Sequence, residues 1–183
     1  MMIRYFLILI CFLCPVFSRA DEPAIDEIRK KYNEIEALKL DSVSVKFELE
    51  DDPLSGKIVI FSDGPHVKKV VYESGAEHGG TTESYYYSNG DLFFVFKQDS
   101  HWRFSGNTRA DGQSETVDGL KELRFYYKDG KCIRALTRET ESPNADVLNE
   151  KIAKLPNLTL DDADLAERIF GKGSTFYGLK WIF

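Results

Sequence analysis

Two short turns between aromatic segments constrain the fold of this chain more than any other feature of its sequence. Asn89-Gly90 and Asp129-Gly130 are the dipeptides most favoured in two-residue β-hairpin turns, because both turn positions take positive φ. Strand-like segments rich in aromatic and β-branched residues flank both turns: residues 82–88 and 91–97 around the first, and residues 122–128 and 131–138 around the second. The spacing predicts two antiparallel hairpins.

The two hairpins also share a sequence pattern. Tyr85–Leu92 aligns with Phe125–Cys132, and a fainter copy ends at Gly64 in a third predicted hairpin, formed by residues 57–62 and 67–73. The copies are unevenly spaced, by 26 and then 40 residues. We therefore interpret them as hairpins of one meander that share turn chemistry, and not as a tandem binding repeat.

Hydrophobic periodicity predicts one more strand and a helix before the hairpins. Residues 42–49 alternate strictly between polar and apolar side chains, which is typical of a half-buried strand. Residues 23–40 repeat apolar side chains every three or four positions and predict an N-terminal helix. The stripe of this helix is Ile25, Ile28, Tyr32, Ile35 and Leu38.

The C-terminal part of the sequence returns to helical periodicity. One helix is expected between Ser142 and Pro156, and a short helix over 160–170 that stops at Gly171. The apolar residues 174–183 are expected to dock as an edge strand or against the sheet. Before these helices, residues 105–116 are polar throughout and predict a long surface loop.

The segment 91–97 is apolar at nearly every position. Strict alternation would place Leu92, Phe94 and Phe96 on one face of a strand, with Phe93 and Val95 on the other. Both faces must then be covered. We expect the N-terminal helix to cover one face, and the C-terminal segment or the opposite wall of a curved sheet to cover the other. The same feature is compatible with an internal cavity.

Together these elements predict an α+β fold. An antiparallel β-meander of about six to eight strands, in a curved sheet or half-barrel, packs against an N-terminal helix and C-terminal helices. We predict a single domain over residues 21–183. Its helix and meander core spans residues 24–140, and a helical C-terminal segment spans residues 141–183.

Residues 1–20 have the three parts of a secretory signal peptide. Arg4 precedes an apolar run over residues 6–17, and Ser18 and Ala20 place small residues before a cleavage site at Asp21. The apolar run is shorter than the roughly 20 residues that a membrane span needs. We therefore expect cleavage, a periplasmic or secreted protein, and no membrane span in the mature chain.

Cleavage would leave an acidic chain with a single cysteine. Residues 21–183 carry a net charge of −8, compared with −6 for the whole sequence, and retain only Cys132. A strand position next to Ile133 favours a buried, apolar thiol. The acidic balance argues against nucleic acid, which needs clustered Lys and Arg, and is compatible with a cationic partner.

Common catalytic and metal-binding motifs are missing from the sequence. Three histidines lie far apart, without the spacing of a zinc site: His66, His78 and His101. The acidic runs at 48–52 and 161–164 lack the spacing of a calcium loop. The aromatic run Tyr85-Tyr86-Tyr87 favours ordinary cross-strand packing over a sugar- or peptide-binding platform. We therefore assign no catalytic, cofactor-binding or metal-ligating residue and expect no cofactor.

The hairpin pattern aromatic-Tyr-x-Asn/Asp-Gly-x-Leu, best developed over Asn89–Phe96, resembles small secreted bacterial proteins of uncharacterised families. It is also distantly similar to the aromatic-Asn-Gly hairpins of MORN-like repeat proteins. The resemblance covers about the middle half of the chain. It implies an antiparallel meander and supplies no functional residues.

The function that we expect is that of an exported, non-enzymatic binding or accessory protein. Its partner would be another protein, and the acidic run Glu50-Asp51-Asp52 favours a cationic one. One alternative is a carrier of a small apolar ligand in a curved-sheet cavity. Another is a hydrolase whose histidine and carboxylates come from loops, with a histidine in a cleft near an acid. The sequence leaves the ligand and the oligomeric state open.

Overall fold

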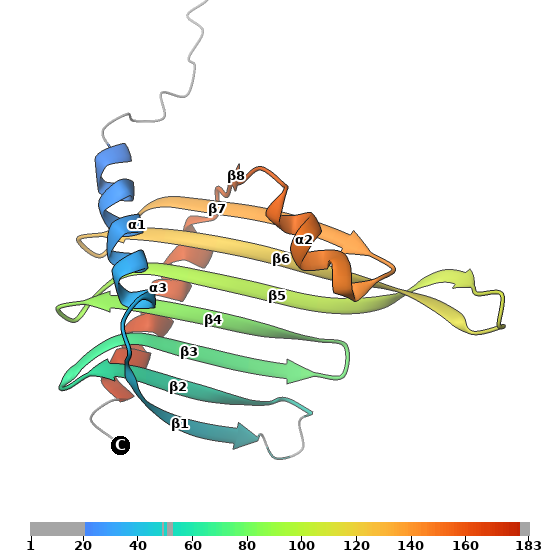
Figure 1. The fold of residues 1–183 in the computed structure, drawn as a ribbon, viewed down its shortest axis with the longest axis horizontal. Helices are drawn as coiled ribbons and strands as arrows, with labels where there is room; N and C mark the ends of the chain where they lie inside the picture. The colour runs from blue at the N-terminus through green and yellow to red at the C-terminus, as the bar shows by residue number, and fades with distance from the viewer. Residues whose placement is uncertain (1–20, 49, 51–52, 180–183) are drawn as a thin grey trace, which may run out of the picture.

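One open antiparallel sheet forms the centre of the molecule (Figure 1). The structure is a computed structural model that describes residues 21–48, 50 and 53–179. Within these residues, eight strands follow one another in sequence order. They are β1 (Asp41–Glu48), β2 (Ser55–Asp63), β3 (His66–Ala76), β4 (Gly79–Ser88), β5 (Asp91–Thr108), β6 (Ser114–Lys128), β7 (Lys131–Ser142) and β8 (Leu158–Thr159). The predicted α+β meander is confirmed, and its sheet is not closed.

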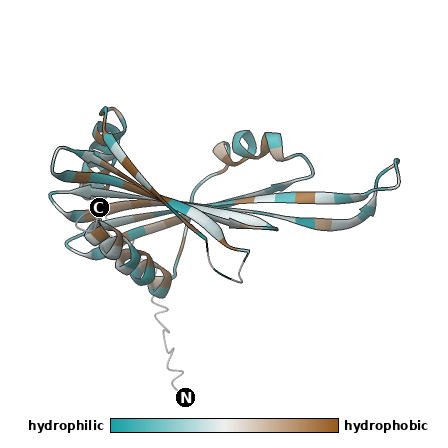
Figure 2. Ribbon diagram, turned by 90° about the horizontal axis from the view of Figure 1, so that it is seen from below, coloured by the Kyte–Doolittle hydropathy of each residue, from teal (hydrophilic) through white to brown (hydrophobic). Residues whose placement is uncertain are grey.

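Helices lie on both faces of this sheet. In sequence order they are α1 (Glu22–Glu36), the 3₁₀ turn η1 (Ala145–Val147), α2 (Leu148–Ala153) and α3 (Ala163–Gly178). Figure 1 shows α1 in front of the sheet and α3 running behind it. Figure 2 shows the sheet nearly edge-on, with helices on both sides at one end and the β5–β6 hairpin extending alone at the other.

The predicted hairpin turns are confirmed. Asn89 and Asp129 have φ values of 53° and 50°, and each is followed by a glycine with positive φ. In each of the three hairpins, β2–β3, β4–β5 and β6–β7, the second strand contains one residue more than the first just after the turn, which shifts the register. These extra residues are Lys68, Phe93 and Ile133. The repeated sequence pattern therefore encodes a repeated turn followed by a β-bulge.

Because of this bulge, the side chains of β5 point to other faces of the sheet than strict alternation predicted. Leu92 and Val95 pack in the cluster that includes α3, whereas Phe93 and Phe94 both pack in the cluster that includes α1. Strict alternation fails because the bulge places two successive side chains on one face. The expectation that an N-terminal helix and the C-terminal segment cover opposite faces of this strand is confirmed.

Aromatic side chains fill both layers beneath the helices. On the α1 face, Tyr86 contacts Phe94 with ring centroids 5.7 Å apart. On the α3 face, Tyr85 contacts Phe176 at 5.2 Å. The buried stripe of α1 is Ile25, Ile28 and Ile35, as predicted. These layers are the hydrophobic core, and they lie at the end of the sheet that carries the three hairpin turns.

Two buried carboxylates lie where the apolar end of the sheet gives way to the polar end. Glu83 is 3% exposed and accepts hydrogen bonds from Tyr85, Lys97 and Lys172. Glu122 is 5% exposed and lies opposite Gln98 and Arg138 in the sheet. Each carboxylate is paired with two cations, which offsets its loss of hydration.

Several predicted boundaries are wrong for identifiable reasons. The first helix ends at Glu36 and not at residue 40, because the chain turns at Ala37 and leaves Leu38 48% exposed. Residues 105–108 and 114–116 belong to β5 and β6, which pair at Phe104 and Thr116 and, after a register shift, again at Thr108 and Ser114, so only residues 109–113 connect the strands. Backbone pairing does not require apolar side chains, so the polar sequence hid this hairpin arm.

The C-terminal expectations need a similar correction. Gly171 does not end α3, because burial of Ile169 and Phe176 continues the apolar stripe past it. Residues 174–178 are therefore helical and form no edge strand, but the expected alternative, docking against the sheet, is confirmed because Phe176 packs on Tyr72 and Tyr85. Residues 180–183 lie outside the described residues. In the 142–156 region, Asn144 caps η1 and α2 follows, which agrees with the predicted helix.

Candidate binding cleft at the β7 edge

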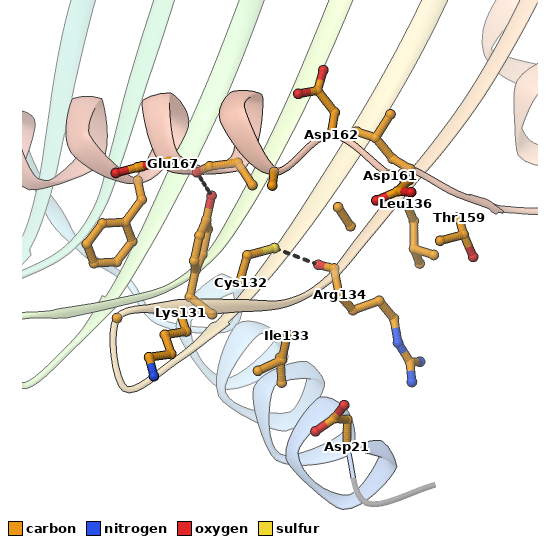
Figure 3. Close-up of a pocket in the computed structure, with 17 residues that line it drawn as sticks. Asp21, Lys131, Cys132, Ile133, Arg134, Leu136, Thr159, Asp161, Asp162 and Glu167 are labelled. Atoms are coloured by element: carbon orange, nitrogen blue, oxygen red, sulfur yellow. Dashed lines mark hydrogen bonds between the residues drawn. The ribbon is translucent and has the colours of Figure 1, made fainter. Parts of the chain in front are cut away.

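A cleft with a volume of about 900 Å³ lies between the outer edge of β7 and the beginning of α3 (Figure 3). Its position follows from the shortness of β8. This strand pairs with β7 only at Leu136 and Thr137, and one further backbone bond joins Leu160 N–H to Ala135 C=O at 2.9 Å. On the side of β7 that faces away from β6, no strand of the described chain pairs with Lys131 to Arg134, so this part of the edge lines the cleft.

Apolar side chains from four elements or their flanks line the interior of the cleft. They come from β6, β7, the segment after β8, and α3: Tyr127, Ile133, Ala135, Leu136, Leu160, Ala166 and Phe170. The bulge at Ile133 and the burial of Phe170 against Tyr127 bring these groups together. The cleft is therefore a concave, mostly apolar surface with backbone at one wall.

The first turns of α3 form the opposite wall. Asp162 caps the helix, because its Oδ1 accepts a hydrogen bond from Leu165 N–H at 2.9 Å. Tyr127 Oη donates to Ala166 C=O at 2.7 Å and so fixes the helix against β6. Burial raises the pKa of the Tyr127 hydroxyl, which keeps this donor protonated at neutral pH.

Carboxylates outnumber cations around the cleft. Its lining includes Asp21, Asp161, Asp162 and Glu167, but only Lys131 and Arg134 with positive charge. Arg134 already pairs with Glu22 of α1 at 2.8 Å. Among the described residues, no ion pair includes Asp161 or Glu167, and Figure 3 shows both on the α3 side of the cleft. The opening is thus negatively charged on one side.

Cys132 lies in the wall of the cleft, and its prediction as a buried thiol is wrong. The residue is exposed, because the edge of β7 that carries it has no neighbouring strand in the described chain. Its Sγ donates to Arg134 C=O at 3.4 Å. Desolvation by the surrounding walls raises the pKa of the thiol, so it is protonated and weakly nucleophilic at neutral pH.

The three histidines do not come together. His66 is exposed at the start of β3, and the His78 ring lies 4.4 Å from that of Trp102. His101 Nε2 is 3.7 Å from Glu141 Oε1, which is longer than a hydrogen bond. None of the histidines lines the β7 cleft. The hydrolase hypothesis, which needs a histidine in a cleft near an acid, therefore finds no histidine in the β7 cleft.

The other residues singled out in the sequence have structural positions. Tyr85, Tyr86 and Tyr87 are all buried, which confirms their prediction as sheet packing. Of the acidic run at 48–52, Glu48 and Glu50 lie within the described residues and Leu49, Asp51 and Asp52 lie outside them. In the second acidic run, Asp161 and Asp162 line the cleft.

The cleft itself has no recognisable pattern in the sequence. The missing element was β8, whose two residues are too few to give a period. The available signal was the pair Leu158 and Leu160, two apolar residues placed between Pro156 and the acidic run. This segment forms part of the cleft lining only because β8 pairs with β7 in the folded protein.

Residues 21–48, 50 and 53–179 contain no group of three or more His, Cys, Asp or Glu side chains that could hold a metal ion. In the same residues, no helix is both long and apolar enough to cross a membrane. Comparisons of this chain with models of protein families, with curated proteins and with solved structures found no match.

Proposed function

We propose that this protein is an exported, non-enzymatic binding protein that holds a basic, partly apolar segment of a partner protein in the β7 cleft. The observation that carries this proposal is the combination found in the cleft: an apolar interior beneath an excess of carboxylates. Export is supported by the signal-peptide pattern of residues 1–20. No catalytic arrangement is needed for this role.

The chemistry of the cleft favours a cationic side chain with an apolar stem. Lysine and arginine bury their methylene groups on apolar surface and keep the charged end in water. Tyr127 and Phe170 offer the apolar surface, and Asp161 and Glu167 offer carboxylates without a partner in the described chain. A volume of about 900 Å³ fits a few side chains but no folded domain.

Electrostatics would add selectivity more than affinity. Asp161 and Glu167 are exposed, so each contributes little energy to a contact in salt. Their shared sign still speeds the approach of a cationic partner and disfavours an anionic one. We therefore expect binding that weakens as salt concentration rises.

The test uses the chain 21–183 and two synthetic peptides, one alternating lysine with leucine and one alternating glutamate with leucine. The basic peptide is expected to bind and to slow alkylation of Cys132, the only cysteine of residues 21–183, which lines the cleft. The double variant Asp161→Lys with Glu167→Lys should weaken binding about tenfold. Equal binding of the acidic peptide, or unprotected Cys132, would overturn the proposal.

A matched control separates the cleft from overall charge. The double variant Glu77→Lys with Asp146→Lys makes the same change in net charge at two exposed positions that do not line the cleft. We expect it to bind the basic peptide as the unmodified chain does, apart from a small nonspecific loss. A loss equal to that of the cleft variant would show that net charge alone attracts the peptide.

A second candidate function, transport of a small apolar ligand, is favoured by the apolar lining of the same cleft. Beneath α3 the space is filled by packed aromatic side chains such as Tyr85 and Phe125, and a hollow between α1 and the sheet has a volume of only about 300 Å³, compared with about 900 Å³ for the β7 cleft. The β7 cleft is therefore where such a ligand would bind. Native mass spectrometry of gently purified protein would show an added small mass that is lost on denaturation. A ligand of this kind that competes with the basic peptide would favour the carrier function.

A further inference from the structure

The other edge of the sheet, β1, has a regular and open backbone. All eight of its residues pair with β2 in unbroken register, from Asp41 opposite Ser62 to Glu48 opposite Ser55. No other strand of the described chain pairs with β1, and in Figure 1 it forms the border of the sheet. Its outer row of N–H and C=O groups is therefore available to another strand.

This edge carries few of the features that normally prevent strand pairing. Proteins protect edges with prolines, bulges, inward charges or covering segments. β1 has no proline and no bulge, and its charged side chains are Lys46 and, at its two ends, Asp41 and Glu48. Val43 is 55% exposed although it belongs to the apolar face of the strand. An exposed valine in regular edge backbone marks a surface suited to association.

The residues of β1 are complementary to a second copy of themselves. In an antiparallel pair, residues directly opposite each other lie on the same face of the sheet. A twofold axis through Val45 therefore pairs apolar residues with apolar residues and polar residues with polar residues. On the α3 face this register places Val45 opposite Val45 and Val43 opposite Phe47. On the other face Ser44 lies opposite Lys46, and Ser42 lies opposite Glu48. No like charges are directly opposed.

Neighbouring registers fit less well. An axis through Ser44 would place the Asp41 carboxylate opposite the Phe47 ring. An axis between two residues would place apolar side chains opposite polar ones, because the period of a strand is two. The sequence of β1 therefore selects one register of self-pairing.

The apolar row on β1 is continuous with the core of the molecule. The Phe47 ring stacks on Tyr72 with centroids 5.7 Å apart, and Tyr72 stacks on Phe176 of α3 at 5.6 Å. Gly56 makes room for Phe47, since a Cβ at this glycine would lie 2.6 Å from the ring. The edge is thus held in place before any partner arrives, which lowers the cost of association.

From this geometry we infer that two copies of the protein associate through their β1 strands, antiparallel across Val45, to form one continuous sheet. This inference is independent of the ligand of the β7 cleft. The two clefts would lie at the far ends of the joined sheet, because β7 and β1 are at opposite ends of the strand order. Each pair would then present two binding sites.

The first test measures the mass of residues 21–183 in solution over a hundredfold range of concentration, by light scattering after size exclusion. We expect a dimer. Val45→Lys places two lysines directly opposite each other at the axis and should give a monomer. Leu38→Lys, which also replaces an exposed apolar residue near this edge but outside β1, should remain dimeric. Circular dichroism checks that both variants are folded.

Mixing two variants distinguishes a broken interface from a damaged fold. Val45→Lys and Val45→Glu should each be monomeric, and an equal mixture should form heterodimers, since the axis places the two new charges together. A destabilised fold would not be rescued by mixing. In a Cys132→Ser background, Val45→Cys should form an intermolecular disulfide on oxidation, whereas Val43→Cys should not, because Val43 faces Phe47.

Two outcomes would overturn the inference. A chain that stays monomeric at every concentration would show that β1 does not pair with itself. A chain that becomes dimeric only after removal of residues 180–183 would assign the β1 surface to the C-terminal segment. Loss of peptide binding at the β7 cleft would leave the dimer result unchanged, so the two proposals fail separately.

Discussion

The two edges of this sheet differ in how their outer backbone groups are covered. At the β7 edge, the extra residue Ile133 breaks the register, and β8 covers part of the strand. At the β1 edge the register is unbroken, and no described strand covers it. The irregular edge discourages a flat partner strand and leaves a concave site. The regular edge suits a flat partner strand.

Helix α3 connects these two edges. Its first turns form a wall of the β7 cleft through Ala166 and Phe170. Near its C-terminal end, Phe176 stacks on Tyr72, which in turn stacks on Phe47 of β1. The two sites therefore share one support, and changes along this helix should affect one edge, the other, or both according to position.

The largest expected effect comes from Phe176→Ala. Phe176 is 7% exposed and contacts both Tyr72 and Tyr85, so its loss leaves a cavity and should cost about 3–5 kcal/mol of unfolding free energy. Association through β1 should weaken because Tyr72 and Phe47 lose their support, while the β7 cleft keeps its contacts. Urea unfolding and both binding assays measure this. Phe170→Ala is the reverse control, since it should weaken only the cleft.

The next effect in size is expected for Glu122→Gln, which removes the negative charge shared by Arg124 and Arg138. Both arginines are also bonded to the segment that leads to β8, through Asn157 Oδ1 at 3.1 Å and Ala153 C=O at 3.4 Å. We expect a loss of about 3 kcal/mol, because two largely buried cations lose their partner. Peptide binding at the β7 cleft should weaken with little change in association through β1. Equal losses at both edges would contradict this.

The same pair gives a pH dependence with a defined sign. Burial alone would raise the pKa of Glu122, but hydrogen bonds and charge from Arg138 and Arg124 outweigh it and lower the pKa below its ordinary value of 4.5. A lowered folded-state pKa contributes stability above the unfolded-state value and loses it as pH falls through the folded-state value. The difference in unfolding free energy between the unmodified chain and Glu122→Gln should therefore shrink below pH 4.5. Urea titrations at several pH values would show whether it does.

A smaller effect is expected in α3 at Gly173, which packs directly on the sheet. A Cβ on Gly173 would come within 2.7 Å of Leu92 and 2.8 Å of Tyr85. Gly173→Ala should therefore cost about 1–2 kcal/mol, because overpacking exceeds the gain in helix propensity. Gly171→Ala is the matched control: nothing lies within 4 Å of its added Cβ, and it should stabilise the protein by about 0.5–1 kcal/mol. Thermal unfolding distinguishes the two signs.

The parts of the fold that could be predicted from sequence are those set by local chemistry. Asn89 and Asp129 adopt positive φ, and the turns they form need no tertiary contact. The helical stripe of Ile25, Ile28 and Ile35 is likewise a local pattern. The faces of β5 were not predictable by alternation, because the bulge at Phe93 changes the phase and depends on pairing with β4.

The candidate sites depended on contacts between distant segments and were largely hidden. Asp162 could be recognised as a helix start, but its place at a cleft follows from β8, two residues that form a strand only against β7. Val43 was expected to be half-buried from its alternation, yet it is 55% exposed. Alternation identifies the apolar face of a strand and does not reveal whether another element covers that face.

The smallest predicted effect tests whether the hydroxyl of Tyr127 positions α3 at the cleft. Tyr127→Phe removes the hydrogen bond to Ala166 C=O and should cost about 1 kcal/mol of unfolding free energy. Tyr87→Phe makes the same deletion farther along the helix, where Tyr87 Oη donates to Gly173 C=O at 2.7 Å. The two variants should be equally destabilised, but only Tyr127→Phe should weaken binding of the basic peptide, because Tyr127 and Ala166 line the cleft and Tyr87 does not. Equal peptide affinity in both variants would mean that the wall of the cleft is held by the packing of Phe170 and Leu160, and that the irregular edge needs no hydrogen bond to keep its shape.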